Sequence, residues 1–423
     1  MRLQADERAM LDGEHGPGVA MAMRVVMGLA KASGAERLVE ISSAHIDGCL
    51  YHGQAGVDFA ERLVQFGSRV RVPTTLNVGS LDLLHPGLVR TQSPMEREVA
   101  AGARRLANAY AALGARSTWT CAPYQADGRP EIGEHTAVAE SNAIAFANSV
   151  LGARTDRYGD FLDICAAITG RAPYAGLHLD ENRRGEIVLD CTELGADVVD
   201  RDLSYPLLGY IAGSVAGTAN PVFIGLPPGV SEDRLKALGA AAASAGGVAL
   251  FHVVGTTPEA ATLEMALHDQ PPVRTEVVTR AQLSAARREL STANGDRLDA
   301  VSIGTPHASL DELRALSNAL DGGPPIDADI TVYASTGRSV LEQARSLGIV
   351  DTLESAGVRL VVDTCTYVTS ILDPSTRVVM TNSGKWAHYA PGNLGVDVVL
   401  ASLDECVSSA RSGRVVLDDD VLR

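Results

Sequence analysis

Short apolar runs alternate with helical patterns along the C-terminal part of the chain. Each run is rich in β-branched residues, ends in a polar or glycine-containing turn, and in most cases leads into an amphipathic stretch. The runs occupy residues 248–254, 300–303, 330–334, 358–362, 377–380 and 397–401. Strands that alternate with helices predict βαβ units and a mostly parallel sheet.

Polar clusters follow these predicted strands at their carboxyl ends, where parallel sheets place ligand sites. The clusters cover residues 305–307, 335–338, 363–365 and 381–385. After the run at 300–303, Ser309 and Glu312 have the spacing of a capping box, which predicts that a helix begins there.

The N-terminal part has the same pattern in a less regular form. A glycine-rich turn and an amphipathic helix fill residues 13–34, and strands are predicted at 37–43 and 68–73. Helices are predicted between about 91 and 160, on either side of a polar segment at 118–135, and again around 209–217 and 232–243. The fold class is therefore α/β, and we expect two regions, 1–245 and 246–423, with an approximate boundary.

Composition narrows the class of protein. The 423 residues are 46% hydrophobic and only 4% aromatic, which favours a core of small and branched aliphatic side chains. A net charge of −16 argues against nucleic-acid binding, which needs a basic face. The sequence has no apolar run of about 18 residues, so we expect no membrane span. The charged N-terminus lacks the apolar core of a signal peptide, which indicates a cytoplasmic protein.

Six cysteines are spread along the chain without a CxxC pair, so a local zinc ribbon is excluded but a site built from distant segments is not. Cys121 lies in a loop among threonines. It could be a ligand of a soft metal or an iron–sulfur cluster, or it could be a small buried hydrophobic residue. Cys365 follows a predicted buried strand, and for it the metal and core interpretations are equally open. If both bind one metal, their sulfurs should lie within ~7 Å, since thiolate bonds are roughly 2.3 Å long.

Other polar residues in these segments have both chemical and structural interpretations. Glu140 shares a predicted helix face with Asn148, and a buried polar group must find a partner in the protein or in a ligand. Arg154 has the spacing to hold a carboxylate or phosphate together with Arg157, or to end a solvated helix. Lys385 follows a strand and a glycine turn that could bind an anion, although neither a Walker A motif nor a GxGxxG fingerprint is present.

Together these segments resemble the aconitase X family, specifically its large catalytic part. The similarity runs in order along nearly the whole chain. The matching stretches are residues 13–23, 44–48, 72–77, 120–124, 140–142, 146–154, 304–309, 363–365 and 381–383.

The resemblance implies an aconitase-like fold with several βαβ subdomains, and a dehydratase that uses an iron–sulfur cluster or a mononuclear iron. Family members act on cis-3-hydroxy-L-proline or on mevalonate 5-phosphate. They combine the large part with a small swivelling domain. Because the last βα unit lies shortly before Arg423, we expect that domain on a separate subunit, together with a catalytic serine.

The resemblance also implies roles for individual residues. Members with three thiolate ligands have a cysteine in a Gly-Cys-Pro-His loop, where this chain has Thr305. The expected metal ligands are Cys121 and Cys365, with Cys49 ranked above Cys406 as a third; Cys165 and Cys191 are expected to be structural. The expected catalytic residues are His45, Asp47, Glu140, His307 and Lys385. The expected substrate-binding residues are Thr75, Asn77, Ser141, Asn142, Asn148, Arg154, Asn382 and Ser383.

Three functions remain open at this point. Dehydration of cis-3-hydroxy-L-proline is favoured, because residues 160–165 and 178–183 resemble the bacterial members. Mevalonate 5-phosphate would need a further anion site, for which residues 335–338 are available. A non-catalytic scaffold for the small partner is the third, because Thr305 cannot replace a thiolate as a soft ligand.

Overall fold

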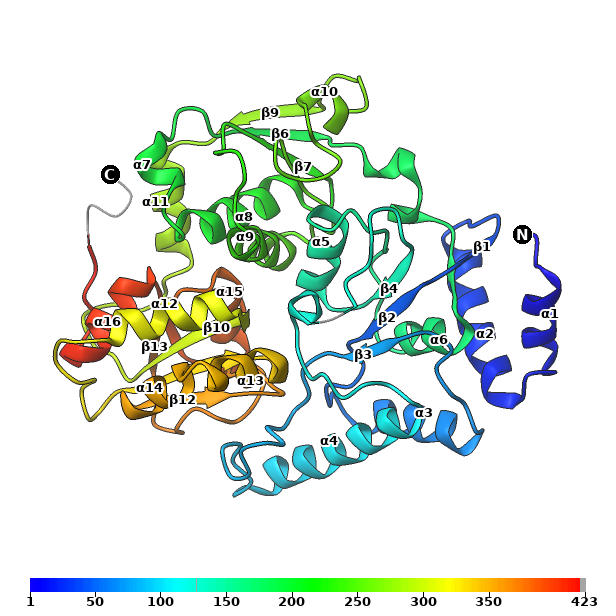
Figure 1. Ribbon diagram of the computed structural model, residues 1–423, viewed down its shortest axis with the longest axis horizontal. Helices are drawn as coiled ribbons and strands as arrows, with labels where there is room; N and C mark the ends of the chain where they lie inside the picture. The colour runs from blue at the N-terminus through cyan, green and yellow to red at the C-terminus, as the bar shows by residue number, and fades with distance from the viewer. Residues whose placement is uncertain (127, 419–423) are drawn as a thin grey trace.

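The computed structural model of the chain describes residues 1–126 and 128–418. Figure 1 shows three α/β units around a common centre: the first from blue to teal on the right, the second green at the top, and the third yellow to red on the left. The three larger sheets are parallel throughout, as predicted. Among the described residues, no helix is both long and apolar enough to cross a bilayer.

The first unit contains a three-stranded parallel sheet in the order β3-β2-β4 and a short antiparallel pair, β1-β5. Its core includes Met23, Ile46 and Leu106, all fully buried. The elements are α1 (Ala5–Asp12), α2 (Pro17–Ala32), β1 (Leu38–Glu40), β2 (Ser43–Ile46), α3 (Gln54–Gln65), β3 (Thr74–Leu76), α4 (Pro94–Ala112), η1 (Pro123–Gln125), β4 (Thr136–Val138), α5 (Ser141–Ser149), α6 (Leu162–Thr169), β5 (Arg171–Pro173), η2 (Gly176–His178) and η3 (Asp180–Arg183).

The strand predicted at residues 68–73 is wrong. There the backbone N–H groups of Val70 and Arg71 donate to the carbonyl oxygens of Leu113 and Ala167, near the ends of α4 and α6, at 2.9 Å each. The ladder with β2 begins only at Thr74, inside the predicted turn. An alternating pattern shows which side chains are buried, but here the segment is buried against helix ends and not in a sheet.

The second unit has a four-stranded sheet in the order β8-β7-β6-β9. In α8, a Cβ at Gly209 would lie 2.1 Å from the Leu238 carbonyl oxygen of α9, and a Cβ at Gly213 would lie 2.6 Å from that of Ala242. Only glycine therefore allows this helix contact. The elements are β6 (Ile187–Asp190), α7 (Ala196–Val199), α8 (Ser204–Ala216), β7 (Pro221–Ile224), α9 (Glu232–Ala245), β8 (His252–Val253), α10 (Leu263–Ala266), β9 (Arg274–Val277) and α11 (Arg280–Glu289).

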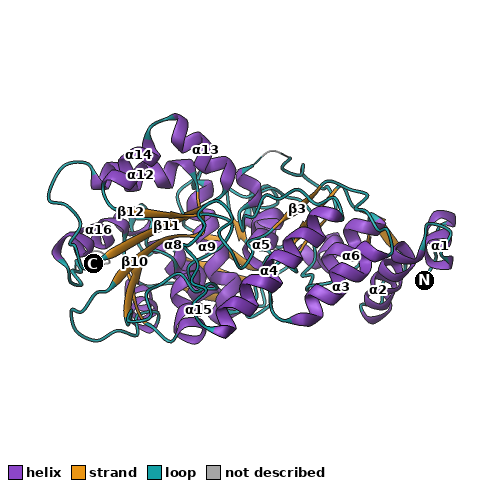
Figure 2. Ribbon diagram, turned by 90° about the horizontal axis from the view of Figure 1, so that it is seen from below, coloured by secondary structure: helices purple, strands orange, loops and turns teal. Residues whose placement is uncertain are grey.

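The third unit has a five-stranded sheet in the order β12-β11-β10-β13-β14, with helices on both faces (Figure 2). All five of its strands were predicted to within a few residues, and so was the capping box of Ser309 and Glu312. The elements are β10 (Ala300–Ala308), α12 (Leu310–Leu320), β11 (Thr331–Thr336), α13 (Arg338–Ser346), α14 (Ile349–Ser355), β12 (Val358–Val361), β13 (Val378–Thr381), α15 (Gly384–Leu394), β14 (Asp397–Leu400) and α16 (Leu403–Ser412).

The sheets divide the chain into three units, and the expected boundary near residue 245 falls inside the second. Residue 245 ends α9, and β8 after it pairs with β7 before it. The second and third units share one hydrophobic core, in which Phe223 and Leu238 of the second unit belong to the same buried cluster as Trp386 of the third.

Candidate metal centre and active site

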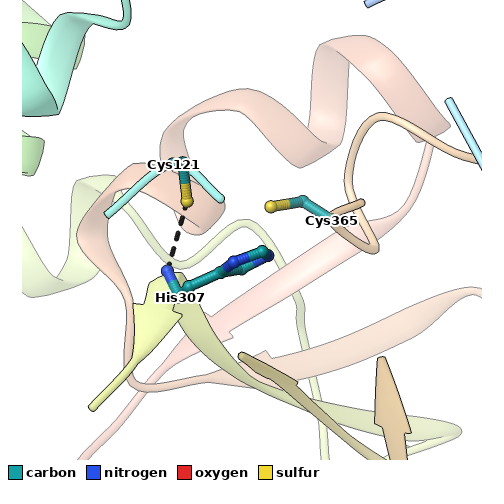
Figure 3. Close-up of side chains that lie close together, drawn as sticks. All are labelled: Cys121, His307 and Cys365. Atoms are coloured by element: carbon teal, nitrogen blue, oxygen red, sulfur yellow. Dashed lines mark hydrogen bonds between the residues drawn. The ribbon is translucent and has the colours of Figure 1, made fainter. Parts of the chain in front are cut away.

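Two cysteines and a histidine from distant parts of the chain meet at the centre of the molecule. One ligand atom from each of Cys121, His307 and Cys365 lies within 4.8 Å of those of the other two (Figure 3). The two sulfurs are therefore well inside the ~7 Å limit for thiolates that share a metal. All three residues are buried, and Figure 3 shows that the two thiols point toward each other.

The fold brings each of these residues to the centre on a different element. Cys121 lies in the loop after α4, which is fixed to the end of β3 by a hydrogen bond from the Thr120 N–H to the Leu76 carbonyl at 3.1 Å. Cys365 follows β12. His307 lies in the last part of β10, after Gly304, where a Cβ would be only 2.2 Å from the Ser335 carbonyl oxygen and φ is 87°.

Hydrogen bonds hold the ring of His307 in place. Its Nε2 lies 3.0 Å from the carbonyl oxygen of Thr364, so Nε2 carries the hydrogen and donates it. Its Nδ1 lies 3.1 Å from the Thr120 hydroxyl, and it is the ring nitrogen that a metal could bind once that hydroxyl turns away. The backbone N–H of His307 donates to the Cys121 sulfur at 3.2 Å, which favours a thiolate there.

The two thiols share one negative charge unequally. Burial by itself raises the pKa of the Cys121 thiol, but the hydrogen bond from Cys365 and the nearby His307 outweigh it and lower this pKa to about 6. The same hydrogen bond, with burial, raises the pKa of Cys365 well above its usual value. Cys121 is thus the thiolate of the pair, and a thiolate is the form that binds metals.

The donor set suits a soft or borderline transition metal. Two sulfurs and an imidazole nitrogen are ligands that iron, iron–sulfur clusters and zinc accept. Thr305, the residue at the position of the third family cysteine, has a buried hydroxyl without a hydrogen-bond partner among the described residues. The residues present therefore fit the kind of group that the sequence predicted, with the His307 imidazole and not a third thiolate as the third donor.

A buried ion pair lies close to these thiols. Lys385, near the start of α15, donates to Glu140, which precedes α5, and both side chains are at most 5% exposed. Burial opposes a charge on Lys385, yet Glu140 holds the pKa of the ammonium well above its usual value. Glu140 also accepts from the Ala143 N–H at 2.8 Å and from Asn142, whose amide donates to the Cys121 carbonyl at 2.8 Å. The pair is thus linked directly to the Cys121 loop.

A second group of predicted residues lies along the carboxyl ends of β2 and β3. His45 Nδ1 is 2.8 Å from the Thr75 hydroxyl, and burial lowers the pKa of His45 to about 3, so its ring is neutral. Asn77 donates to Asp47. Burial and the charge of Glu140 raise the pKa of Asp47 to about 7, so its carboxyl group can exchange a proton near neutrality.

The structure places the other predicted metal ligands in apolar cores. The Cys49 thiol donates to the carbonyl oxygens of Ile46 and Asn77 at 3.4 and 3.3 Å, and burial raises its pKa. Cys406 lies within α16 in the core of the third unit. Neither belongs to the Cys121–His307–Cys365 group.

Two predicted substrate-binding residues have structural partners instead. Asn148 donates to the carbonyls of Thr155 and Ala249 at 2.9 Å each and accepts from Arg183, so its hydrogen-bonding capacity is largely used. Arg154 forms an ion pair with Asp180. Ser141 is the first residue of α5 and is half-buried.

A cavity of about 1000 Å³ opens between the second and third units. It lies at the carboxyl ends of β10, β13 and β14, where the sequence predicted a site. Asn382 and the 305–306 turn line it. Ser383 also lines it; its hydroxyl donates to the Thr305 carbonyl and accepts from the Trp386 N–H at 3.0 Å, which ties the turn to α15.

Some contributors were missed in the sequence. Thr120 and Thr364 hold the His307 ring, and Asp363 with Arg338 supports the Cys365 loop. The available signal was position: Thr120 and Thr364 directly precede Cys121 and Cys365, and Asp363 lies two residues before Cys365. Nothing in the chain pattern indicated that Arg338 pairs with a buried carboxylate.

Comparison with known proteins shows the family of the chain. Models of the aconitase X first, second and third domains match residues 1–181, 185–288 and 298–412, which are the three units of the structure. The crystal structure of aconitase X from Thermococcus kodakaraensis in its holo-form superposes with a TM-score of 0.86 and 33% identity, over 97% of this chain and 100% of that one.

Several curated relatives are dehydratases by name. Cis-3-hydroxy-L-proline dehydratases from Pseudomonas aeruginosa and Hypocrea jecorina are 44% and 40% identical over 98% of this chain and 70% and 69% of their own length. The phosphomevalonate dehydratase large subunit from Methanothermobacter thermautotrophicus is 38% identical over 94% of this chain and 96% of its own. The chain therefore belongs to the aconitase X family, as its sequence motifs predicted.

Proposed function

We propose that this chain is the large, catalytic subunit of a dehydratase that converts cis-3-hydroxy-L-proline to Δ1-pyrroline-2-carboxylate. The observation that carries the proposal is the convergence of Cys121, Cys365 and His307 beside the buried Lys385–Glu140 pair. The two relatives named for this activity are 44% and 40% identical over 98% of the chain.

The metal group in this proposal is an iron–sulfur cluster or a mononuclear iron. Cys121 and Cys365 would hold it through sulfur, and His307 through Nδ1 after the Thr120 hydroxyl turns away. When bound, the group supplies a Lewis acid that makes the 3-hydroxyl a better leaving group.

In this proposal, residues of the chain stabilise negative charge on the substrate and exchange protons with it. In the reaction the proton on Cα goes to a base, the C3–O bond breaks, and the hydroxyl leaves as water after gaining a proton. The enamine product then tautomerises to the imine. Lys385, fixed by Glu140, places a permanent positive charge where negative charge builds up on the substrate carboxylate and Cα. Asp47, with a pKa of about 7, is the group we assign to proton exchange on this side.

The alternative substrate, mevalonate 5-phosphate, is disfavoured because the arginines available for its phosphate are already paired with carboxylates. A phosphate dianion needs unpaired positive charge. Arg338, the residue proposed for that anion, binds the buried carboxylate of Asp363 with two hydrogen bonds of 2.6 Å. Arg154 is likewise paired, with Asp180.

We also propose a separate small subunit. The archaeal phosphomevalonate dehydratase relatives are named as large subunits, and that name implies a small partner. That partner would provide the swivelling domain and the serine that acts as base. A cytoplasmic location is part of the proposal, because the site depends on two reduced thiols.

The test is turnover of the reconstituted pair. The chain is purified without oxygen, loaded with iron and sulfide, and mixed with a small subunit of aconitase X type. Mass spectrometry then follows Δ1-pyrroline-2-carboxylate from cis-3-hydroxy-L-proline, with trans-3-hydroxy-L-proline and mevalonate 5-phosphate as comparison substrates. Formation of the imine from the cis compound is expected. Turnover of mevalonate 5-phosphate alone would select the other substrate, and a folded chain that binds no iron would indicate a scaffold.

A further inference from the structure

The loop that carries Cys365 is held by a carboxylate two residues earlier. Asp363 is fully buried, and its φ of 63° is in the left-handed region, which few residues other than glycine, asparagine and aspartate enter. Its carboxylate accepts from Nε and Nη2 of Arg338, the first residue of α13, at 2.6 Å each. This two-point contact neutralises a charge that is costly to bury alone.

Asp363 also accepts hydrogen bonds from the first unit, and a carboxylate of the first unit accepts one from the third. Asp363 accepts from the Leu83 N–H through its side chain at 3.1 Å, and from the Gly79 N–H through its backbone carbonyl at 2.7 Å. In the other direction, the buried side chain of Asp82 accepts from the Val362 N–H at 3.0 Å. Each unit thus donates backbone hydrogens to a buried aspartate of the other.

The first-unit segment in this exchange also supports both thiols. Residues 78–85 follow β3, and Val78 packs against Cys121 and Cys365 in one small buried cluster. Cys121 is joined to the end of β3 through the Thr120–Leu76 hydrogen bond. Both cysteines are therefore connected, by short paths of hydrogen bonds and packing, to one stretch of the first unit.

We propose that Asp82, Asp363 and Arg338 form an inter-unit clasp that sets the separation of the Cys121 and Cys365 thiols. None of the three is placed as a ligand; they are positioning residues that act through the backbone. The metal-binding test of this proposal rests on the proposed metal centre, whereas the thiol-reactivity test does not.

The first test titrates the metal-free protein with Co²⁺ alone and follows the thiolate-to-cobalt charge-transfer band. The variants Asp363→Asn, Asp82→Asn and Arg338→Lys are compared with the natural chain. We expect Co²⁺ affinity to fall by about 10–100-fold, as for other groups that orient a metal ligand. The band should weaken, because the two sulfurs no longer meet at one ion. Arg338→Lys keeps the positive charge but loses the two-point contact with Asp363. Its Co²⁺ affinity should therefore lie between that of the other variants and that of the natural chain.

The second test measures iodoacetamide alkylation of Cys121 and Cys365 in metal-free protein by peptide mass spectrometry. Opening of the clasp should raise both rates by roughly tenfold through local unfolding, while alkylation of Cys191 in the second unit stays constant. If Asp363→Asn does not fold, Asp82→Asn and Arg338→Lys answer the question, since far-ultraviolet circular dichroism reports folding independently.

Asp299→Asn is the matched control. Asp299 also accepts two backbone N–H groups, those of Arg377 and Val378 at 2.8 and 2.9 Å, and pairs with Arg297, but it joins only elements of the third unit. It should leave cobalt binding and alkylation unchanged. The proposal would be overturned if all three clasp variants had the same cobalt affinity, band intensity and alkylation rates as the natural chain. If the natural chain shows no thiolate band, the metal centre fails instead, and the alkylation rates alone decide on the clasp.

Discussion

At the scale of single residues, the partners of a side chain decide its role more than its type does. All six cysteines are buried, yet only Cys121 has a lowered pKa, because the hydrogen bond from the Cys365 thiol and the nearby His307 outweigh the effect of burial. Cys49 has carbonyl oxygens around its thiol and is held protonated. The same residue type is thus prepared to bind metal at one position and to fill a core at another.

Serine substitutions separate these two groups of cysteines. Cys121→Ser and Cys365→Ser should lose the bound iron, and activity should fall by more than the roughly 10–100-fold that loss of an outer partner of a ligand costs. Cys49→Ser and Cys406→Ser should keep the iron content of the natural chain. Iron per chain and dehydratase rate are the measurements. Loss of iron in Cys49→Ser with iron retained in Cys365→Ser would contradict the site described above.

The Lys385–Glu140 pair makes an energetic prediction. Lys385→Met leaves a buried carboxylate without its cation and should destabilise the metal-free protein by about 3–5 kcal/mol. The double variant Lys385→Met/Glu140→Gln should recover part of that loss, because no unpaired charge remains. Urea unfolding provides the free energies.

Arg314→Met is the control for this pair, because Arg314 and Asp311 form an exposed ion pair and its loss should cost no more than about 1 kcal/mol. Equal stability of the single and double variants would show that the two charges are not coupled.

At the scale of elements, the third unit was the most predictable part of the chain. Its strands are buried on both faces and are read as continuous β-branched runs, and Ser309 with Glu312 marks the start of α12 unambiguously. The same reasoning predicted a strand wrongly at residues 68–73. There, burial against the ends of α4 and α6 produces the pattern of a strand, but the segment has no strand partner. Periodicity reports which side is buried and not what covers it.

A buried histidine in η2 predicts how stability depends on pH. His178 contacts His135 and the Tyr158 hydroxyl, and burial, with the charge of His135, lowers its pKa to about 3. The unfolded chain takes up a proton below about pH 6.5 and the folded chain does not, so the free energy of unfolding falls as the pH drops. Between pH 7.5 and 5.5 this histidine should contribute a loss of about 1.4 kcal/mol.

The measurement is urea unfolding of His178→Gln and of His52→Gln, an exposed control, at both pH values. His178→Gln should have the smaller loss on acidification, and His52→Gln should match the natural chain. An unchanged loss in His178→Gln would show that the ring is charged in the folded state.

At the scale of the whole molecule, contacts between units were beyond the reach of the sequence. Cys121 and Cys365 were proposed as a pair, and His307 as a catalytic residue, from family motifs. That His307 lies beside the two thiols as a third donor was not predicted, since its place depends on how the first and third units meet. Arg183 is another case: its buried guanidinium binds Glu259 of the second unit and the carbonyls of Leu177 and Asn148 in the first. No local pattern predicts such long-range partners.

Arg183 should therefore stabilise the junction of the first two units. Arg183→Met should cost about 3–5 kcal/mol, because it leaves Glu259 and two buried carbonyls without a donor. Arg129→Met is the matched control, since the Arg129–Glu232 pair also joins these units but is exposed, and it should cost at most about 1 kcal/mol. Thermal unfolding distinguishes the two, and equal shifts in midpoint would refute the assignment.

The core shared by the second and third units has a consequence for how the protein is made. Those two units share one buried cluster, whereas most of the first unit's buried side chains form a cluster of their own, as does the remainder of the third unit's core. The two thiols of the centre come from different units, Cys121 from the first and Cys365 from the third. The group formed by Cys121, His307 and Cys365 can exist only after the first and third units have folded and docked. For the metal proposed above, binding would thus be a late event in the maturation of the chain, and an occupied site would report that the units have docked.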